Sequence, residues 1–191
     1  MCGRYYITDG IDIIDVIIEA IREKYKDSNV LGQMKLSEVF PTDVAPVVTA
    51  VSPQLMQWGF SGFGGKGIII NARLESADAK PMFERAFHSQ RCLVPAGWYF
   101  EWKKDRAKKE KYAIRGKEPL FMAGLYQVEK GSELPRFVIL TRPAAPELAF
   151  IHDRMPVIIT EAEKKDWLNG KIEVSINDET VNLTSFVCND L

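Results

Sequence analysis

Short strand-like runs recur along the whole chain and constrain its fold more than any other feature. They are rich in β-branched, aromatic and aliphatic residues and are bounded by glycine, proline or polar turns, a pattern typical of strands. None is long enough to cross a lipid bilayer. With 191 residues, of which 46% are hydrophobic, the chain can bury one core, and we expect residues 1–191 to form a single domain. The runs lie at 4–8, 68–70, 91–95, 120–126, 136–141, 157–159 and 172–176, with shorter extended pieces over 37–60.

Helical periodicity is limited to a few segments. Isoleucines recur at helical spacing over residues 11–25 while acidic residues take the opposite face, which predicts a surface helix with one stripe on the core. Thr8 or Asp9 is expected to cap its first turn. Shorter helices are predicted at 80–87, where Pro81 suits a first turn, at 143–150, and at 160–168, where Thr160 and Glu163 form a capping box.

Charge and cysteine content exclude several classes of protein. The formal net charge is −1, so no global basic field indicates nucleic-acid binding, and such binding must depend on a local patch. Cysteines at positions 2, 92 and 188 are too widely spaced for a disulfide framework or for a zinc site of the Cys-x-x-Cys kind. The start of the chain does not have the pattern of a signal peptide. We therefore expect a cytoplasmic protein without a metal site.

The second residue carries the strongest chemical signal. If Met1 is removed, Cys2 has two nucleophiles on adjacent carbons, a thiol with a reference pKa of about 8.5 and an α-amine of about 7.7–8.0. Such a 1,2-aminothiol can attack a carbonyl carbon with its amine and then close a five-membered ring with its sulfur. The strand predicted at 4–8 would place Cys2 at the rim of a sheet, where a nearby acid or base could assist it.

A carboxylate and a basic run follow the strand at 91–95. Glu101 stands among four aromatic residues, which predicts partial desolvation, a raised pKa and a role as proton donor, although an arginine partner across the sheet is the alternative. Residues 103–117 are predominantly basic and lie beside tryptophan and tyrosine. This mixture suits single-stranded nucleic acid, and the alternative is a solvated hairpin tip.

Two further polar clusters lie where strands meet loops. The run 68–70 is predicted to be a buried strand that delivers the polar residues 71–75, and residues 151–156 form the other cluster. His152 in that cluster is either a catalytic histidine or a buried structural one. Cys92 is expected in the core and His88 on the surface.

Several separated motifs match one known family, in the same order along the chain. They are Met1-Cys2-Gly3-Arg4-Tyr5, residues 39–47, Trp58-Gly59-Phe60, Asn71-Ala72-Arg73-x-Glu75, residues 91–96 with Phe100-Glu101-Trp102, Ala123-Gly124-Leu125, and residues 151–156. Together they resemble the SRAP family, the SOS response-associated peptidases, which process abasic sites in DNA. The resemblance covers essentially the whole chain.

The resemblance implies an α+β fold, with a single domain built round a curved, partly barrel-like mixed β-sheet surrounded by helices. The activity that it implies is covalent capture of abasic sites in single-stranded DNA by a monomer, without a cofactor, a metal or a membrane. It assigns catalytic roles to Cys2, Asn71, Glu101 and His152, and DNA contacts to Arg4, Arg73 and Trp102, with Lys103 and Lys104 opening the basic run.

The implied chemistry uses the aldehyde form of the abasic deoxyribose. The Cys2 amine forms an imine with the aldehyde and the thiol closes a thiazolidine, while Glu101 protonates the sugar ring oxygen and His152 transfers protons. Loss of Met1, either autocatalytically or by an aminopeptidase, accounts for the peptidase in the family name. One departure concerns the glycine-rich stretch 61–67, where many members carry a DNA-stacking tryptophan. Phe60 or Phe63 is expected to substitute for it.

Three other functions remain open from the sequence. Glutamine amidotransferases also begin Met-Cys-Gly, so an N-terminal-nucleophile amidohydrolase is one. A thiol peptidase that acts on other proteins through Cys2, His152 and Glu101 is the second. A non-covalent single-strand binding module using residues 103–117 is the third, and it predicts salt-sensitive binding that never becomes covalent.

Overall fold

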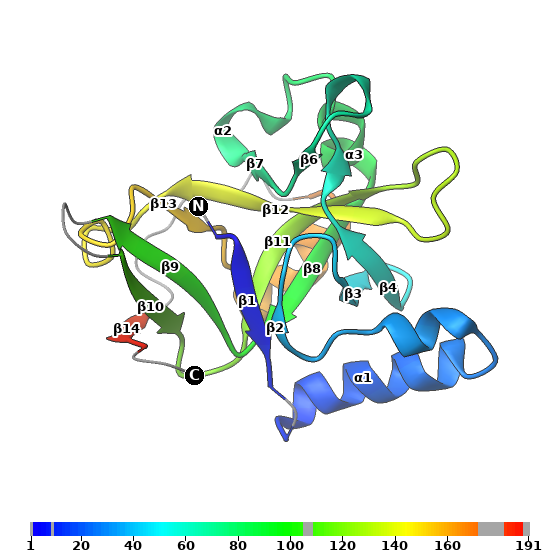
Figure 1. The fold of residues 1–191 in the computed structure, drawn as a ribbon, viewed down its shortest axis with the longest axis horizontal. Helices are drawn as coiled ribbons and strands as arrows, with labels where there is room; N and C mark the ends of the chain where they lie inside the picture. Colours follow the sequence, from blue (N-terminus) through cyan, green and yellow to red (C-terminus); the bar gives the residue numbers. More distant parts are fainter. Residues whose placement is uncertain (1, 9, 105–108, 172–181, 189–191) are drawn as a thin grey trace.

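The computed structural model describes residues 2–8, 10–104, 109–171 and 182–188, and shows two main β-sheets with helices around them (Figure 1). The α+β fold with a barrel-like mixed sheet, expected from the sequence, is confirmed. The helices are α1 (Asp12–Tyr25), η1 (Asn29–Gln33), η2 (Phe63–Gly65), α2 (Leu74–Ala77), α3 (Glu84–Ser89), η3 (Glu161–Glu163) and α4 (Lys164–Leu168), where η marks a 3-10 helix.

Five strands close into a barrel. They are β11 (Leu120–Gln127), β8 (Arg91–Ala96), β3 (Val44–Thr49), β4 (Pro53–Trp58) and β12 (Arg136–Pro143), and the ring closes because β11 pairs with both β8 and β12. The β4–β12 pairing is parallel and the other four are antiparallel. The far end of β12 also pairs with β7 (Asn71–Arg73) and β13 (Arg154–Pro156), which brings two polar clusters of the sequence to one end of the barrel.

A second sheet holds the start of the chain. Its order is β14 (Thr184–Val187), β10 (Lys109–Arg115), β9 (Trp98–Lys104), β1 (Arg4–Ile7) and β2 (Ser37–Val39), and a separate hairpin is made by β5 (Phe60–Ser61) and β6 (Ile68–Ile69). The chain passes from β8 into β9 at Gly97, whose backbone N–H donates to the Tyr6 carbonyl oxygen. A Cβ atom at Gly97 would lie 2.4 Å from the Thr8 hydroxyl oxygen, so only glycine fits between the two sheets here.

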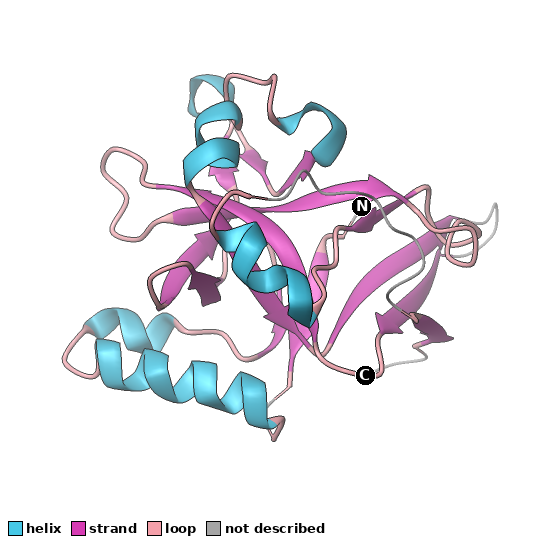
Figure 2. Cartoon of the chain, turned by 180° about the vertical axis from the view of Figure 1, so that it is seen from behind, coloured by secondary structure: helices cyan, strands magenta, loops and turns pink. Residues whose placement is uncertain are grey.

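Side chains of the barrel strands alternate between an inner face and an outer face, as the period of two requires. The inner set joins Tyr5 and Tyr99 of the second sheet in one core, where the Tyr5 and Trp58 ring centroids lie 5.2 Å apart. The outer sets pack against the helices on the outside (Figure 2): α3 and α4 contribute Ala86 and Trp167, and α1 contributes Ile21.

Most predicted elements are confirmed, including the capping box of Thr160 and Glu163. Thr8 does not cap the first helix, because α1 follows Ile11 without a side-chain cap, and the other predicted cap, Asp9, lies outside the described residues; the Gly10 N–H donates to the Asp15 carboxylate. Lys80-Pro81 begins a turn, and the helix itself begins only at Glu84.

Three other local predictions need correction. Residues 143–150 form turns rather than a helix, because after Pro143 the chain folds back to pair β13 with β12. The run 68–70 is not a buried strand: only Ile68–Ile69 pairs, with β5, and Ile68 is 43% exposed. The strand β14 was not predicted, and the predicted run 172–176 lies outside the described residues. Within the described part of the chain, no helix has both the length and the apolar character that crossing a membrane requires.

Candidate functional site

Cys2 lies at the start of β1, beside the end of the barrel where β7 and β13 pair with β12 (Figure 1). The Asn71 side-chain amide donates to the Cys2 carbonyl oxygen at 2.9 Å, and the Cys2 thiol lies 3.5 Å from the Arg4 carbonyl oxygen, which accepts from it. The thiol is fully buried, and burial raises the pKa of Cys2, with the charge of Glu101 adding to the effect. The thiol therefore stays protonated near neutral pH.

Glu101 projects from β9 into the same enclosed region. It is 3% exposed, and desolvation raises the pKa of its carboxyl group, as expected from its aromatic neighbours in the sequence. The charge of Asp153 raises this pKa further, which places the turn that carries His152 within electrostatic reach of Glu101. The structure therefore brings Cys2, Asn71, Glu101 and this turn to one place.

His152 lies in the turn before β13, and its side chain is 23% exposed. The Arg154 backbone N–H donates to Nδ1 of His152 at 3.0 Å, while a carboxylate oxygen of Asp153 lies 2.7 Å from the same nitrogen. One nitrogen cannot serve both partners at once: an Nδ1 without a proton accepts from Arg154, whereas an Nδ1 that carries a proton, in a neutral or a charged ring, donates to Asp153. Nδ1 thus has a partner whether or not it carries a proton.

Arg154 anchors the turn that carries His152 through hydrogen bonds to Glu75 and Thr141. Its guanidinium makes two hydrogen bonds to the Glu75 carboxylate, at 2.6 and 2.9 Å, and a third to the Thr141 carbonyl oxygen at 2.7 Å. The paired guanidinium holds the pKa of Glu75 below its ordinary value. Both residues belong to sequence motifs, but sequence reasoning gave them no role, because nothing in the sequence shows that they meet.

Replacing Arg154 by methionine should lower the free energy of unfolding by about 1–3 kcal/mol, because the Thr141 carbonyl oxygen loses a buried donor. Urea unfolding measures this loss. The matched control is Arg136→Met, since Arg136 lies at the other end of β12 from Thr141, pairs with Glu129 and donates to the Gly59 carbonyl oxygen. Only Arg154→Met should shift the His152 ring signals in NMR spectra, with exposed His88 as internal reference. An unchanged His152 signal would show that Arg154 does not position the turn.

The residues predicted to contact DNA lie around this site on several elements. Arg4 is partly exposed with its guanidinium 5.0 Å from the Trp102 ring centroid, and Arg73 is exposed at the end of β7. Lys103 lies on the opposite face of β9 from Trp102, with its ammonium 5.5 Å from the Phe150 ring centroid. The side chain of Lys104 and residues 105–108 of the basic run lie outside the described part of the structure.

The two phenylalanines expected to replace a stacking tryptophan differ in exposure. Phe60 is fully buried in the core against Phe83, so it is excluded as a DNA-stacking residue. Phe63 is 80% exposed in the glycine-rich stretch and stays a candidate. The exposed Phe150, two residues before His152, was missed because nothing in the sequence separated it from a core aromatic residue.

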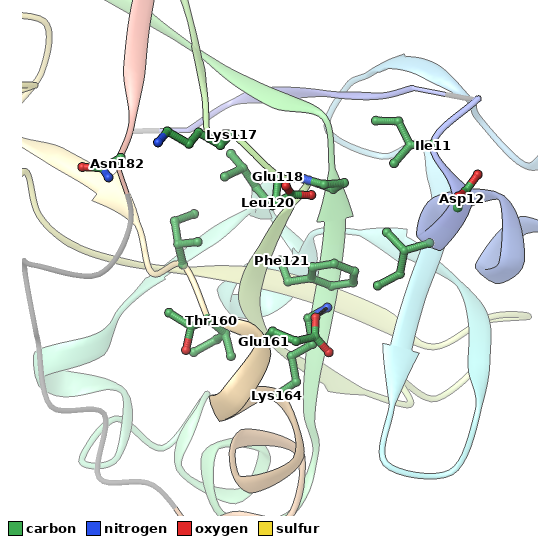
Figure 3. Close-up of a pocket in the computed structure, with 15 residues that line it drawn as sticks. Ile11, Asp12, Lys117, Glu118, Leu120, Phe121, Thr160, Glu161, Lys164 and Asn182 are labelled. Carbon is green, nitrogen blue, oxygen red and sulfur yellow. Dashed lines mark ion pairs between the residues drawn. The ribbon is translucent and has the colours of Figure 1, made fainter.

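A pocket of about 650 Å³ lies elsewhere, between the start of α1, the turn before β11 and the start of α4 (Figure 3). Leu120 and Phe121 line it, and the Lys164 ammonium lies 3.2 Å from the Phe121 ring centroid and pairs with Glu161. None of the predicted site residues lines this pocket. In the described part of the chain, no group of three or more histidine, cysteine, aspartate or glutamate residues is placed to hold a metal ion.

Solved structures share this arrangement of barrel and second sheet. A protein from Bacteroides thetaiotaomicron is 25% identical with a TM-score of 0.76, covering 97% of this chain and 91% of that one. A phage-related protein from Bordetella bronchiseptica, 21% identical with a TM-score of 0.73, has the same fold over 99% of this chain and 95% of that one. The fold therefore belongs to a known structural class.

The family within that class is identified from the sequence. The model of the SOS response associated peptidase (SRAP) family matches residues 1–186, and the chain belongs to this family. The abasic site processing protein YobE of Bacillus subtilis is 37% identical over 109 residues, which are 54% of this chain and 50% of that protein. The abasic site processing protein YedK of Escherichia coli is 35% identical over 120 residues, 60% of this chain and 54% of that protein. The matches span about half the length of these curated relatives.

Proposed function

We propose that the chain, once Met1 is removed, captures abasic sites in single-stranded DNA as a thiazolidine between Cys2 and the deoxyribose aldehyde. The observation that carries this proposal is the enclosure of Cys2 beside Glu101, with Asn71 bonded to the Cys2 carbonyl oxygen. Relatives named as abasic site processing proteins support the choice of substrate. A role in the response to DNA damage follows from this substrate.

The first step opens the sugar ring. An abasic deoxyribose is mostly a cyclic hemiacetal, and a carboxyl group whose pKa is raised keeps its proton to higher pH and can give it to the ring oxygen. Glu101 is suited to this step because burial raises its pKa. The anomeric hydroxyl proton leaves as the ring bond breaks, which yields the aldehyde and a free hydroxyl group.

The second step forms the covalent link. The Cys2 amine attacks the aldehyde carbon, and the resulting carbinolamine loses water to give an imine, with His152 transferring the protons. The thiol sulfur then bonds to the same carbon while its proton goes to the imine nitrogen. No oxidant or cofactor is needed, since the sum is aldehyde plus aminothiol giving thiazolidine plus water.

The raised pKa of Cys2 favours a reaction that begins with the amine over the thiolate chemistry of the two alternative enzymes, a thiol peptidase and a glutamine amidohydrolase. A thiol peptidase or a glutamine amidohydrolase begins with attack by a thiolate, which needs a lowered pKa at the cysteine. Burial and the charge of Glu101 act in the opposite direction. Imine formation begins with the amine, and the thiol can deliver its own proton in the closing step.

DNA contacts around the site complete the proposal. The partly exposed Arg4 and the exposed Arg73 would contact phosphates near Cys2, and Trp102 would offer an aromatic surface. Lys103 with the exposed ring of Phe150 would contact the strand near His152. Lys104 extends the basic run in the same direction along the chain.

The test is an incubation of the Met1-processed protein with a single-stranded oligonucleotide that carries one abasic site. We expect a band that survives denaturing electrophoresis and a mass equal to the two components minus one water. A tetrahydrofuran analogue, which has no aldehyde, should give no band, and neither should protein that retains Met1. An adduct with the tetrahydrofuran analogue would rule out the proposed chemistry.

A further inference from the structure

The face of the second sheet that is turned away from the barrel carries aromatic rings and cations over four strands. Residues on this face follow from the pairing register, because directly paired residues share a face. Arg4 pairs with Phe100, which pairs with Ala113, which in turn pairs with Phe186 of β14. The residues between these, such as Tyr5 and Tyr99, point into the core.

Three cations on this face each lie over a ring. The Arg4 guanidinium carbon is 4.4 Å from the Phe40 ring centroid, the Lys111 ammonium is 3.9 Å from that of Phe100, and the Arg115 guanidinium carbon is 5.4 Å from that of Phe186. Arg115 is exposed, and Phe186 is 42% exposed. Phe40 is 38% exposed, whereas Phe100, which Lys111 covers, is 1% exposed, so the accessible rings are Phe40 at one end of this face and Phe186 at the other.

A stacked pair lies on this face where β1 and β9 meet. Tyr6 and Trp98 pair across β1 and β9, with ring centroids 4.3 Å apart and an angle of 9° between the planes. One carboxylate on this face, Glu38, has an oxygen that accepts from Arg4 at 3.3 Å and from Lys111 at 2.9 Å. Glu38 therefore holds two cations side by side and leaves their other donors for a further anion.

We propose that this face is a track for single-stranded DNA beyond the abasic site, formed by Arg4, Lys111, Arg115 and Phe186 with the Tyr6–Trp98 stack. The proposal rests on the proposed function and extends it to the neighbouring nucleotides. Alternating cations and rings fit a ligand with a phosphate and a base in each unit, and this combination binds single strands without sequence preference. From β1 to β14 the track spans three strand spacings, about 14 Å, which accommodates a few nucleotides.

Arg115 and Phe186 test the track, since they lie at the end farthest from Cys2. Fluorescence anisotropy with undamaged single strands of about 5 and about 15 nucleotides measures the affinity as a function of salt. Phe186→Ala should weaken binding of the longer strand about 5- to 150-fold, the range for one lost stacked base. Arg115→Gln should reduce the slope of log K against log salt by about 0.7, the value for one phosphate contact on a single strand. The shorter strand should respond less.

One matched control comes from β14 and the other from outside the basic run 103–117. Val187→Ala changes an equally exposed residue on β14 that pairs with Tyr112 and so lies on the opposite face, and Lys130→Gln removes an exposed cation from the turn between β11 and β12. Neither should change the affinity or the salt slope. Wild-type affinity and slope in both Phe186→Ala and Arg115→Gln would overturn the track. Failure of abasic-site capture would leave this result untouched, because the anisotropy probe contains no abasic site.

Discussion

Cys2→Ala protein with Met1 removed should bind an abasic single strand but form no complex that survives denaturation without a reducing agent. Alanine keeps the α-amine, so the imine can still form, but no sulfur is present to close the ring. An imine hydrolyses on denaturation, and we therefore expect the stable adduct to fall below about one hundredth of the wild-type yield. Denaturing electrophoresis after equal incubation times measures the difference.

Borohydride separates the role of the amine from that of the thiol. It reduces the imine carbon–nitrogen bond to an amine, so it should restore a denaturation-resistant adduct to Cys2→Ala protein while adding little to the wild-type yield. Cys92→Ala is the matched control, since Cys92 is equally buried but lies within β8 and has no free amine. A stable adduct in Cys2→Ala without borohydride would show that the sulfur does not form part of the link.

The fold could be predicted from the sequence as far as local patterns determine it. The isoleucine stripe of α1 and the capping box at Thr160 are properties of neighbouring residues, and both are confirmed in the structure. Closure of the barrel is different, because it depends on β11 pairing with β8 and with β12 at once. Only the family resemblance predicted a barrel-like sheet, since strand order is a long-range property.

The candidate site likewise contains residues that local sequence patterns indicate and contacts that only the folded chain creates. Cys2 and Glu101 could be chosen from the sequence because their chemistry is local: a second-position cysteine, and a carboxylate among aromatic rings. The Arg154–Glu75 pair joins residues that are 79 positions apart, so no local pattern indicates it. Phe60 was offered as a DNA-stacking residue because its sequence neighbours resemble a motif, whereas the fold turns its ring into the core.

Glu101→Gln should lower the rate of capture by about 10²- to 10⁴-fold, the range for loss of one general acid. Glutamine has nearly the same shape but cannot donate a proton to the sugar ring oxygen. Single-turnover time courses of adduct formation measure the rate, and Glu133→Gln, an exposed carboxylate on the turn before β12, is the control. Glu101→Asp keeps the acid at a shorter reach and should recover part of the rate. A wild-type rate in Glu101→Gln would exclude Glu101 as the proton donor.

The same substitution should make the folded protein more stable at neutral pH. The pKa of Glu101 is raised in the folded state, so its protonated form favours folding, and that contribution is complete below the unfolded pKa of about 4.3 and is lost as the pH rises through the folded pKa. Glutamine has no charge to desolvate, so the gain in Tm of Glu101→Gln over wild type should be absent near pH 4 and grow toward pH 8. Thermal unfolding at both pH values measures it. A gain that is the same at both would mean that the burial of a charge is not what destabilises the wild-type protein. Higher stability together with lost capture would identify Glu101 as a residue held in an unfavourable environment because the reaction requires its proton.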